Sequence, residues 1–315
     1  MIELTTTRAN PMVDPTLHVW GWEIPVYLFL GGLVAGMMAI TGYLLLSDRF
    51  RRAESAIRIL PALAIALLSL GMFALFLDLE LGRHAFRLYL TFEAASPMSW
   101  GAWILVAVYP ALVAALLVRP PDLVAARLPW AAGLGRRIAG NRDALRWIGS
   151  ANLLLGGLLG IYTGVLLSSL GARPLWNSAL LGPLFLVSGL STAAALVHLI
   201  AREPFERELL AKADNGLLML ELVFLALFLI GLLGAGTAHA RAARLLLDGP
   251  YAAVFWVAVV ALGIVVPLVV QLLAVRHRVL HTPVAPLLVV AGGLVLRFLI
   301  VDAGQVSHWT AAMMR

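Results

Sequence analysis

The sequence has no cysteine. A chain without thiols forms no disulfide bond, and it offers no thiolate ligand for zinc or for an iron–sulfur cluster. Any such cluster that works with this chain must therefore belong to a partner. Charged side chains are also scarce: they make up 13% of the 315 residues, about half the usual share in soluble domains. These two shortages exclude a disulfide scaffold and an ordinary soluble globular domain.

Hydrophobic residues make up 62% of the chain and are gathered in long runs. Each run is near the 17–25 residues that a helix needs to cross a bilayer, and none shows the alternation of a membrane barrel strand. The sequence therefore predicts an all-α integral membrane protein with eight transmembrane helices, forming a single polytopic membrane domain over residues 1–315 with an outer N-terminal segment at 1–21. The expected spans lie near residues 22–46, 57–78, 98–118, 147–171, 177–200, 214–235, 250–275 and 284–301.

The stretch from His18 to Leu46 contains the first of these runs. The first twenty residues lack the basic and apolar regions of a cleavable signal, so the first span is expected to act as its own insertion signal. The expected location is a bacterial cytoplasmic (inner) membrane. Small residues recur in this span at spacings of three and four, which leaves a groove for a neighbouring helix backbone. They are Gly31, Gly32, Ala35, Gly36, Ala39 and Gly42.

Basic residues are distributed unevenly between alternate loops. Fifteen of them follow the first, third, fifth and seventh spans, and seven lie in the other loops and near the termini. Because loops rich in lysine and arginine stay in the cytoplasm, both termini are predicted to face the outside. The formal net charge of +6 is interpreted as this topology signal and not as a surface for nucleic acid.

Two carboxylates are candidates for proton handling. Asp78 lies near the outer end of the second span, where both structural ion pairing with nearby basic residues and a proton-handling role are open interpretations. Glu221 lies inside the sixth span, a turn or two from the predicted cytoplasmic edge, and has no partner in the sequence around it. It must be neutral or line a hydrated cavity, which favours proton handling. In the last span, an outward-directed Arg297 paired with Asp302 is the simplest interpretation.

Two further residues are candidates for binding a ligand. Tyr162 lies about nine residues before the outer end of the fourth span, roughly 13 Å deep, so its hydroxyl needs a hydrogen-bond partner and a functional role is favoured. His18 precedes the first span, with Asp14 four residues before it. A histidine at the mouth of an apolar helix can exchange protons near neutral pH. Asp14, His18, Asp78 and Tyr162 all fall in the outer half of the predicted topology.

Six segments, in this order and spacing, resemble the NrfD/PsrC family of membrane subunits in respiratory molybdenum and cytochrome complexes. They span nearly the whole chain. Each segment alone is weak evidence for the family, so the resemblance depends on all six together. The segments are residues 25–32, the region around Asp78, residues 96–101 (SPMSWG), residues 162–164 (YTG), residues 183–195 and residues 296–305.

This resemblance implies two four-helix bundles, with no haem and no metal in this chain, and a menaquinone or ubiquinone site near the outer surface. His18 and Tyr162 match the family positions that bind quinone oxygens. Asp14 stands where the polysulfide reductase pattern has an asparagine, and it could accept a proton that asparagine could not. The implied partners are an extrinsic ferredoxin-like iron–sulfur subunit and a catalytic subunit of molybdopterin type, both on the outer face.

Two other classes of protein are alternatives. A haem-b quinol cytochrome would need paired histidines on facing helices, whereas the seven histidines here fall at span ends or in loops. A secondary transporter would show inverted repeats and a polar site near the middle of the membrane. The sequence shows no clear repeat and almost no charge expected at mid-membrane.

Overall fold

The computed structural model describes residues 20–47, 54–79, 86–201, 204–275 and 283–309. Asp14 and His18 lie outside these described residues. Within them the chain is helical, and the elements are joined by short turns. The helices are α2 (Glu23–Leu46), α3 (Glu54–Asp78), α4 (Arg87–Leu90), α5 (Pro97–Val118), α6 (Asp122–Arg127), α7 (Pro129–Gly140), α8 (Arg142–Ser168), α9 (Leu181–Ile200), α10 (Pro204–Ala235), α11 (Thr237–Leu247), the π-helix η3 (Val254–Val265), α12 (Val266–Val275) and α13 (Val284–Gln305).

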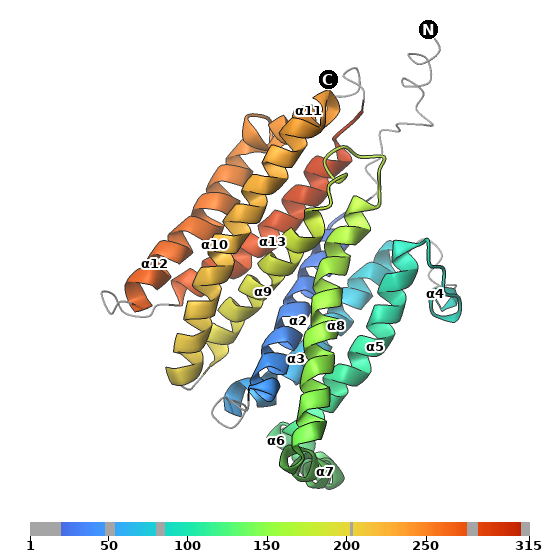
Figure 1. Cartoon of the computed structure of the whole chain (residues 1–315), viewed down its shortest axis with the longest axis vertical. Helices are drawn as coiled ribbons and strands as arrows, with labels where there is room; N and C mark the ends of the chain where they lie inside the picture. The colour runs from blue at the N-terminus through green and yellow to red at the C-terminus, as the bar shows by residue number, and fades with distance from the viewer. Residues whose placement is uncertain (1–19, 48–53, 80–85, 202–203, 276–282, 310–315) are drawn as a thin grey trace.

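Eight helical segments in the described ranges are long and apolar enough to cross a membrane, with η3 and α12 together forming one of them. They pack as two groups of four (Figure 1). Helices α2, α3, α5 and α8 form the first bundle, and α9, α10, η3–α12 and α13 form the second. The predictions of eight membrane helices and of two four-helix bundles are therefore confirmed.

Helix α2 lies at the junction of the two bundles. It contacts α3 and α8 in its own bundle and α9 and α13 in the other. The small-residue groove predicted in this helix is where the neighbours approach: a Cβ on Gly36 would lie 2.6 Å from the carbonyl oxygen of Gly189 in α9, and one on Gly42 would lie 2.6 Å from that of Gly149 in α8. The glycines thus let three helix backbones come together.

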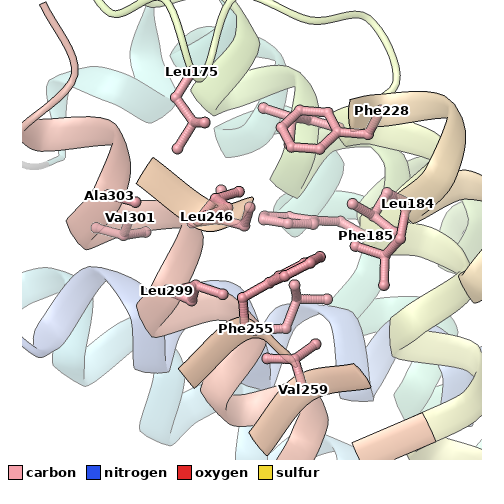
Figure 2. Packing of buried hydrophobic residues seen from close by; sticks show 14 of the residues in the cluster. Leu175, Leu184, Phe185, Phe228, Leu246, Phe255, Val259, Leu299, Val301 and Ala303 are labelled. Atoms are coloured by element: carbon pink, nitrogen blue, oxygen red, sulfur yellow. The ribbon is translucent and has the colours of Figure 1, made fainter. Parts of the chain in front are cut away.

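The core of the second bundle is apolar and aromatic. Figure 2 shows Phe185, Phe228 and Phe255, from three different helices, turned toward the same interior. These rings fill the space beside α13, whose Gly292 packs against Gly263 of η3. Pro267 follows η3 and lacks the N–H that would continue the helical hydrogen-bond ladder. The polar side chains described below are enclosed by this packing.

The chain entering α2 is tied to the end of α13. Gln305 accepts a hydrogen bond from the backbone N–H of Trp20 (2.9 Å) and donates one to its carbonyl oxygen (3.0 Å). The Trp20 ring also stacks on Trp176, with ring centroids 5.1 Å apart, and the Trp176 indole donates to the carbonyl of Ile300 (2.8 Å). These contacts fix the start of the first span, two residues after His18.

Candidate functional site

Two buried tyrosines meet at one end of the first bundle. This is the end at which α2 and α5 begin and α3 and α8 end, and we call it the outer end after the prediction from loop charge. Tyr27 of α2 and Tyr162 of α8 are 2% and 6% exposed, and their hydroxyl groups are hydrogen bonded to one another. The expectation that a deep Tyr162 needs a polar partner is confirmed, and Tyr27 is that partner.

Gly101 at the start of α5 makes room for the Tyr162 ring. A Cβ at this position would overlap the ring and its hydroxyl. Gly101 belongs to the SPMSWG segment, and its neighbours shape the preceding turn: Ser99 Oγ accepts from the backbone N–H of Glu93 (3.0 Å), and the Trp100 indole donates to the carbonyl of Ala94 (2.9 Å). The glycine is required because the tyrosine hydroxyl is brought against the α5 backbone.

Tyr89 of α4 joins the tyrosine pair from the rim. It is close enough to interact electrostatically with both Tyr27 and Tyr162. Partial burial and the neighbouring Tyr109 raise the pKa of the Tyr89 hydroxyl above its usual value. It therefore stays protonated near neutral pH and can donate a hydrogen bond.

A pair of carboxylates lies beside the tyrosines. Asp78, the last residue of α3, faces Glu23, the first residue of α2, closely enough for the two charges to repel one another. Glu23 is one turn before Tyr27 on the same helix. The alternative partners of Asp78 suggested by the sequence, Arg83, His84 and Arg87, have no described side chains.

A second group of polar residues lies inside the other bundle. Arg297 of α13 is 1% exposed and donates to Ser188 Oγ (2.8 Å) and to the carbonyl of Phe185 (3.0 Å), both in α9. Its guanidinium carbon lies 4.3 Å from the centre of the Phe185 ring. The interpretation of Arg297 as an outward-directed partner of Asp302 is therefore wrong: the side chain turns into the bundle, where an α9 carbonyl and hydroxyl replace water.

Glu221 is bound to the same hydroxyl. It is 4% exposed, forms a hydrogen bond with Ser188 and interacts electrostatically with Arg297. Glu221 also lies farther from the helix end than the sequence indicated, because α10 begins at Pro204 and its first turns are polar, with an exposed pair of Glu208 and Lys212. Its partners, Ser188 and Arg297, come from other helices and not from the neighbouring sequence. Glu221 lies near the middle of the span Arg207–Ala235.

Asp214 is a buried carboxylate that the sequence analysis missed, because it was placed at the boundary of the sixth span. It is 1% exposed. Ser191 Oγ donates to one of its oxygens (2.6 Å), and the Gln271 amide of α12 donates to the other (2.7 Å). The sequence feature that could have identified Asp214 is its spacing from Glu221. The two are seven residues apart, which puts both on one face of α10. Ser188 and Ser191, three apart on α9, face them in the same way.

These contacts form one line of buried polar groups. It consists of two sets, Gln271–Asp214–Ser191 and Ser188–Glu221–Arg297. Their carboxylates are about 10 Å apart along α10 and interact electrostatically. Arg297 reaches α2, where a Cβ on Gly32 would lie 3.2 Å from its Nη2 atom. Since Gly32 is five residues after Tyr27, the polar line ends one to two turns from the tyrosine site. The expectation of almost no mid-membrane charge is wrong.

The sequence matches the family described as "Polysulphide reductase, NrfD" over residues 10–308. The chain belongs to this family. Curated relatives include the C subunit of polysulfide reductase from Wolinella succinogenes, 28% identical over 91% of this chain and 94% of the relative. Protein NrfD of Escherichia coli is 29% identical, covering 92% of this chain and 96% of the relative, and an NrfD homologue of Haemophilus influenzae is 28% identical over 96% and 99%. The resemblance inferred from the six segments is confirmed.

Membership of the NrfD family agrees with the membrane fold and favours a respiratory membrane subunit over a transporter or a haem cytochrome. Among the described residues of this NrfD-family member, no group of three or more histidine, aspartate and glutamate side chains could hold a metal ion. The polar groups that the structure does bring together at the outer end are tyrosine hydroxyls, which can donate, and carboxylates, which accept. These groups suit a neutral ligand with carbonyl or hydroxyl oxygens.

Proposed function

We propose that this protein is the membrane-anchoring, quinone-interacting subunit of a respiratory oxidoreductase complex. The observation that carries the proposal is the hydrogen-bonded pair of Tyr27 and Tyr162, enclosed by α2, α4, α5 and α8. Quinone, when bound, supplies two-electron, two-proton chemistry at its two carbonyl oxygens. The tyrosine hydroxyls can donate to an oxygen at one end of such a headgroup, and Gly101 leaves room for the Tyr162 ring that carries one of them.

The rest of the proposed site surrounds this pair. Asp78, with Glu23 beside it at the outer end of the bundle, is proposed to take up or release protons. His18 is proposed to bind the other end of the headgroup and to exchange protons with the outer aqueous phase. This assignment follows from the family resemblance and from its position two residues before Trp20, which is anchored to Gln305. Asp14 is proposed as a neighbouring proton acceptor.

The electrons must pass to another subunit. Without cysteine, this protein has no thiolate ligand for an iron–sulfur cluster. We therefore assign the electron carrier to an extrinsic ferredoxin-like subunit on the outer face, bound in turn to a catalytic subunit of molybdopterin type. The relative from polysulfide reductase, by its name one part of an enzyme with several subunits, supports this arrangement.

Proton handling inside the membrane is assigned to the buried polar line. Asp214 and Glu221 are carboxylates held by serine hydroxyls, which can both donate and accept hydrogen bonds. Each carboxylate can exchange a proton with its serine, and water entering between the two sets would have to carry the proton from one to the other along α9 and α10. Arg297 balances negative charge at its outer end. In this role Glu221 and Asp214 connect the middle of the membrane with the tyrosine site.

The native complex provides the test of the redox assignment. We expect mild detergent purification to yield this protein together with subunits that contain iron, and the complex to bind a quinone analogue such as a hydroxyquinoline N-oxide. Iron is measured by elemental analysis and the analogue by quenching of tryptophan fluorescence. A complex without iron, or one that the analogue does not bind, would contradict the proposed function.

The orientation of the site is tested by reporter fusions. We expect a reporter that is active only outside the cytoplasm to be active when fused after Arg315 and inactive when inserted in the segment between α6 and α7, near Leu128. A cytoplasm-specific reporter at the same two positions serves as the control and should give the reverse pattern. Activity of the first reporter near Leu128 would place the tyrosine site on the cytoplasmic side.

A further inference from the structure

The opposite end of the first bundle, which we call the inner end, has a cationic cavity. Its volume is about 630 Å³, within the usual range for ligand sites. It is lined by the start of α3, the end of α5, and the two short helices α6 and α7, which lie across this end of the bundle (Figure 1). Three arginines from three of these elements line it: Arg58, Arg119 and Arg136.

The local sequence explains how the cavity forms. Arg119 is the first residue after α5, and the following Pro120-Pro121 pair ends that helix and turns the chain. Helix α7 then packs back on the end of α5 at Gly135, where a Cβ would lie 2.6 Å from the carbonyl oxygen of Leu117. This close approach leaves Arg136, next to Gly135, on the wall of the cavity.

The charge of the lining favours an anion. Asp122 is the one acidic residue among the lining side chains, and both of its oxygens accept from Nη1 of Arg58, at 2.9 and 3.1 Å. Among the described lining side chains, three arginines and one aspartate carry a formal net charge of +2. Arginine in such an arrangement suits phosphate oxygens, which accept several charge-assisted hydrogen bonds at once.

The cavity lies at the level where the apolar spans end. Arg58 follows Ile57, the first residue of one span, and Arg119 follows Val118, the last residue of another. On α6, on α7 and near the start of α8, large apolar side chains are exposed: Leu123 is 78% exposed, Trp130 61% and Trp147 78%. Tryptophan and leucine exposed on helices at a span boundary are typical of side chains that enter the lipid headgroup layer.

We propose that this cavity binds the phosphate of an anionic phospholipid of the inner leaflet, such as phosphatidylglycerol or cardiolipin. The arginines bind the phosphodiester, while Leu123 and Trp130 on α6 and α7 contact the upper part of the acyl chains. A free phosphate compound shares the first interaction and lacks the second. The proposal does not depend on the quinone assignment, since the cavity and the tyrosine site lie at opposite ends of the bundle.

The test compares two double variants of the full-length protein, purified in mild detergent. Arg119→Gln with Arg136→Gln removes two cavity charges, and Arg127→Gln with Arg137→Gln removes two charges from α6 and α7 that do not line the cavity. Binding of phosphatidylglycerol, phosphatidylcholine and inorganic phosphate is measured by native mass spectrometry and by the shift in Tm. At about 1 kcal/mol for each arginine, we expect the cavity variant to lose about 20- to 30-fold in phosphatidylglycerol affinity.

The expected pattern is that wild type and the Arg127/Arg137 variant bind phosphatidylglycerol alike, prefer it to phosphatidylcholine, and do not release it to millimolar inorganic phosphate. If inorganic phosphate displaces the lipid and raises the Tm as much as phosphatidylglycerol does, the cavity is a free-phosphate site and the lipid assignment is overturned. Equal phosphatidylglycerol binding by the two double variants overturns the site itself. If the cavity variant fails to fold, Arg136→Gln alone, on an exposed position of α7, gives the same comparison with Arg137→Gln.

Discussion

Replacing Tyr162 by phenylalanine is expected to weaken binding of a quinone analogue by roughly ten- to hundredfold. Loss of a hydrogen bond to a quinone oxygen that carries developing charge costs about 1.5–3 kcal/mol. Phenylalanine keeps the ring that fills the space beside Gly101, so the change isolates the hydroxyl. The measurement is analogue affinity in the purified native complex, together with quinone-linked turnover.

Helix α2 offers a matched control for this prediction. Tyr43 lies at the inner end of the same helix and is 44% exposed, so Tyr43→Phe should leave analogue affinity unchanged.

His18→Ala should lower quinone-linked turnover, while electron transfer from an artificial donor within the partner subunits continues. Glu221→Gln should keep the analogue affinity and impair proton uptake, and it should also lower the stability because Arg297 loses its counter-charge. Wild-type affinity in both the Tyr162 and His18 variants would show that the site lies elsewhere.

A stronger perturbation of the same site is available at Gly101. A methyl group there would occupy the space of the Tyr162 hydroxyl, so Gly101→Ala should move the ring and reduce analogue affinity at least as much as Tyr162→Phe. Gly157→Ala, where nothing lies within 4 Å of the added Cβ, is the matched glycine control.

The membrane fold was readable from the sequence because bilayer thickness fixes the length of a span and lipid forbids an unpaired backbone. The small-residue groove of α2 was readable for a similar reason: spacing alone puts Gly32, Gly36 and Gly42 on helix faces that other backbones can approach. Span boundaries were less accurate. Helix α10 begins at Pro204 and not near residue 214, since charged side chains such as Glu208 and Lys212 remain at the surface while the helix continues.

The tyrosine site was only partly predictable. Depth along a helix identified Tyr162, but its partner Tyr27 sits in another span, and only packing could pair the two. The network around Arg297 shows the same limit. Asp302 is five residues away in the sequence and was the obvious partner, whereas the contacts formed are with Ser188 and Phe185, more than one hundred residues earlier. Long-range pairing of buried polar groups depends on helix arrangement, which no local pattern encodes.

Removing the Arg297 guanidinium is expected to give the largest loss of stability. Arg297→Met keeps most of the side-chain volume but leaves Glu221 buried without its cation, and breaking a buried pair in this way costs about 3–5 kcal/mol. The Ser188 hydroxyl and the Phe185 carbonyl also lose a donor. Two quantities are measured on the purified protein in detergent: the free energy of unfolding and the Tm.

The double variant Arg297→Met with Glu221→Gln distinguishes a charge effect from a packing effect. If the loss comes from the uncompensated carboxylate, neutral glutamine should restore most of the stability, because it can still accept a hydrogen bond from Ser188. The two changes should then be strongly non-additive, with a coupling free energy in the upper part of the usual range of about 0.5–3 kcal/mol. Additive losses would mean that Arg297 stabilises the bundle through its contacts with α9 and the Phe185 ring alone. Glu221 would then have to be neutral in the folded protein, and the charge balance assigned to Arg297 in the polar line would be withdrawn.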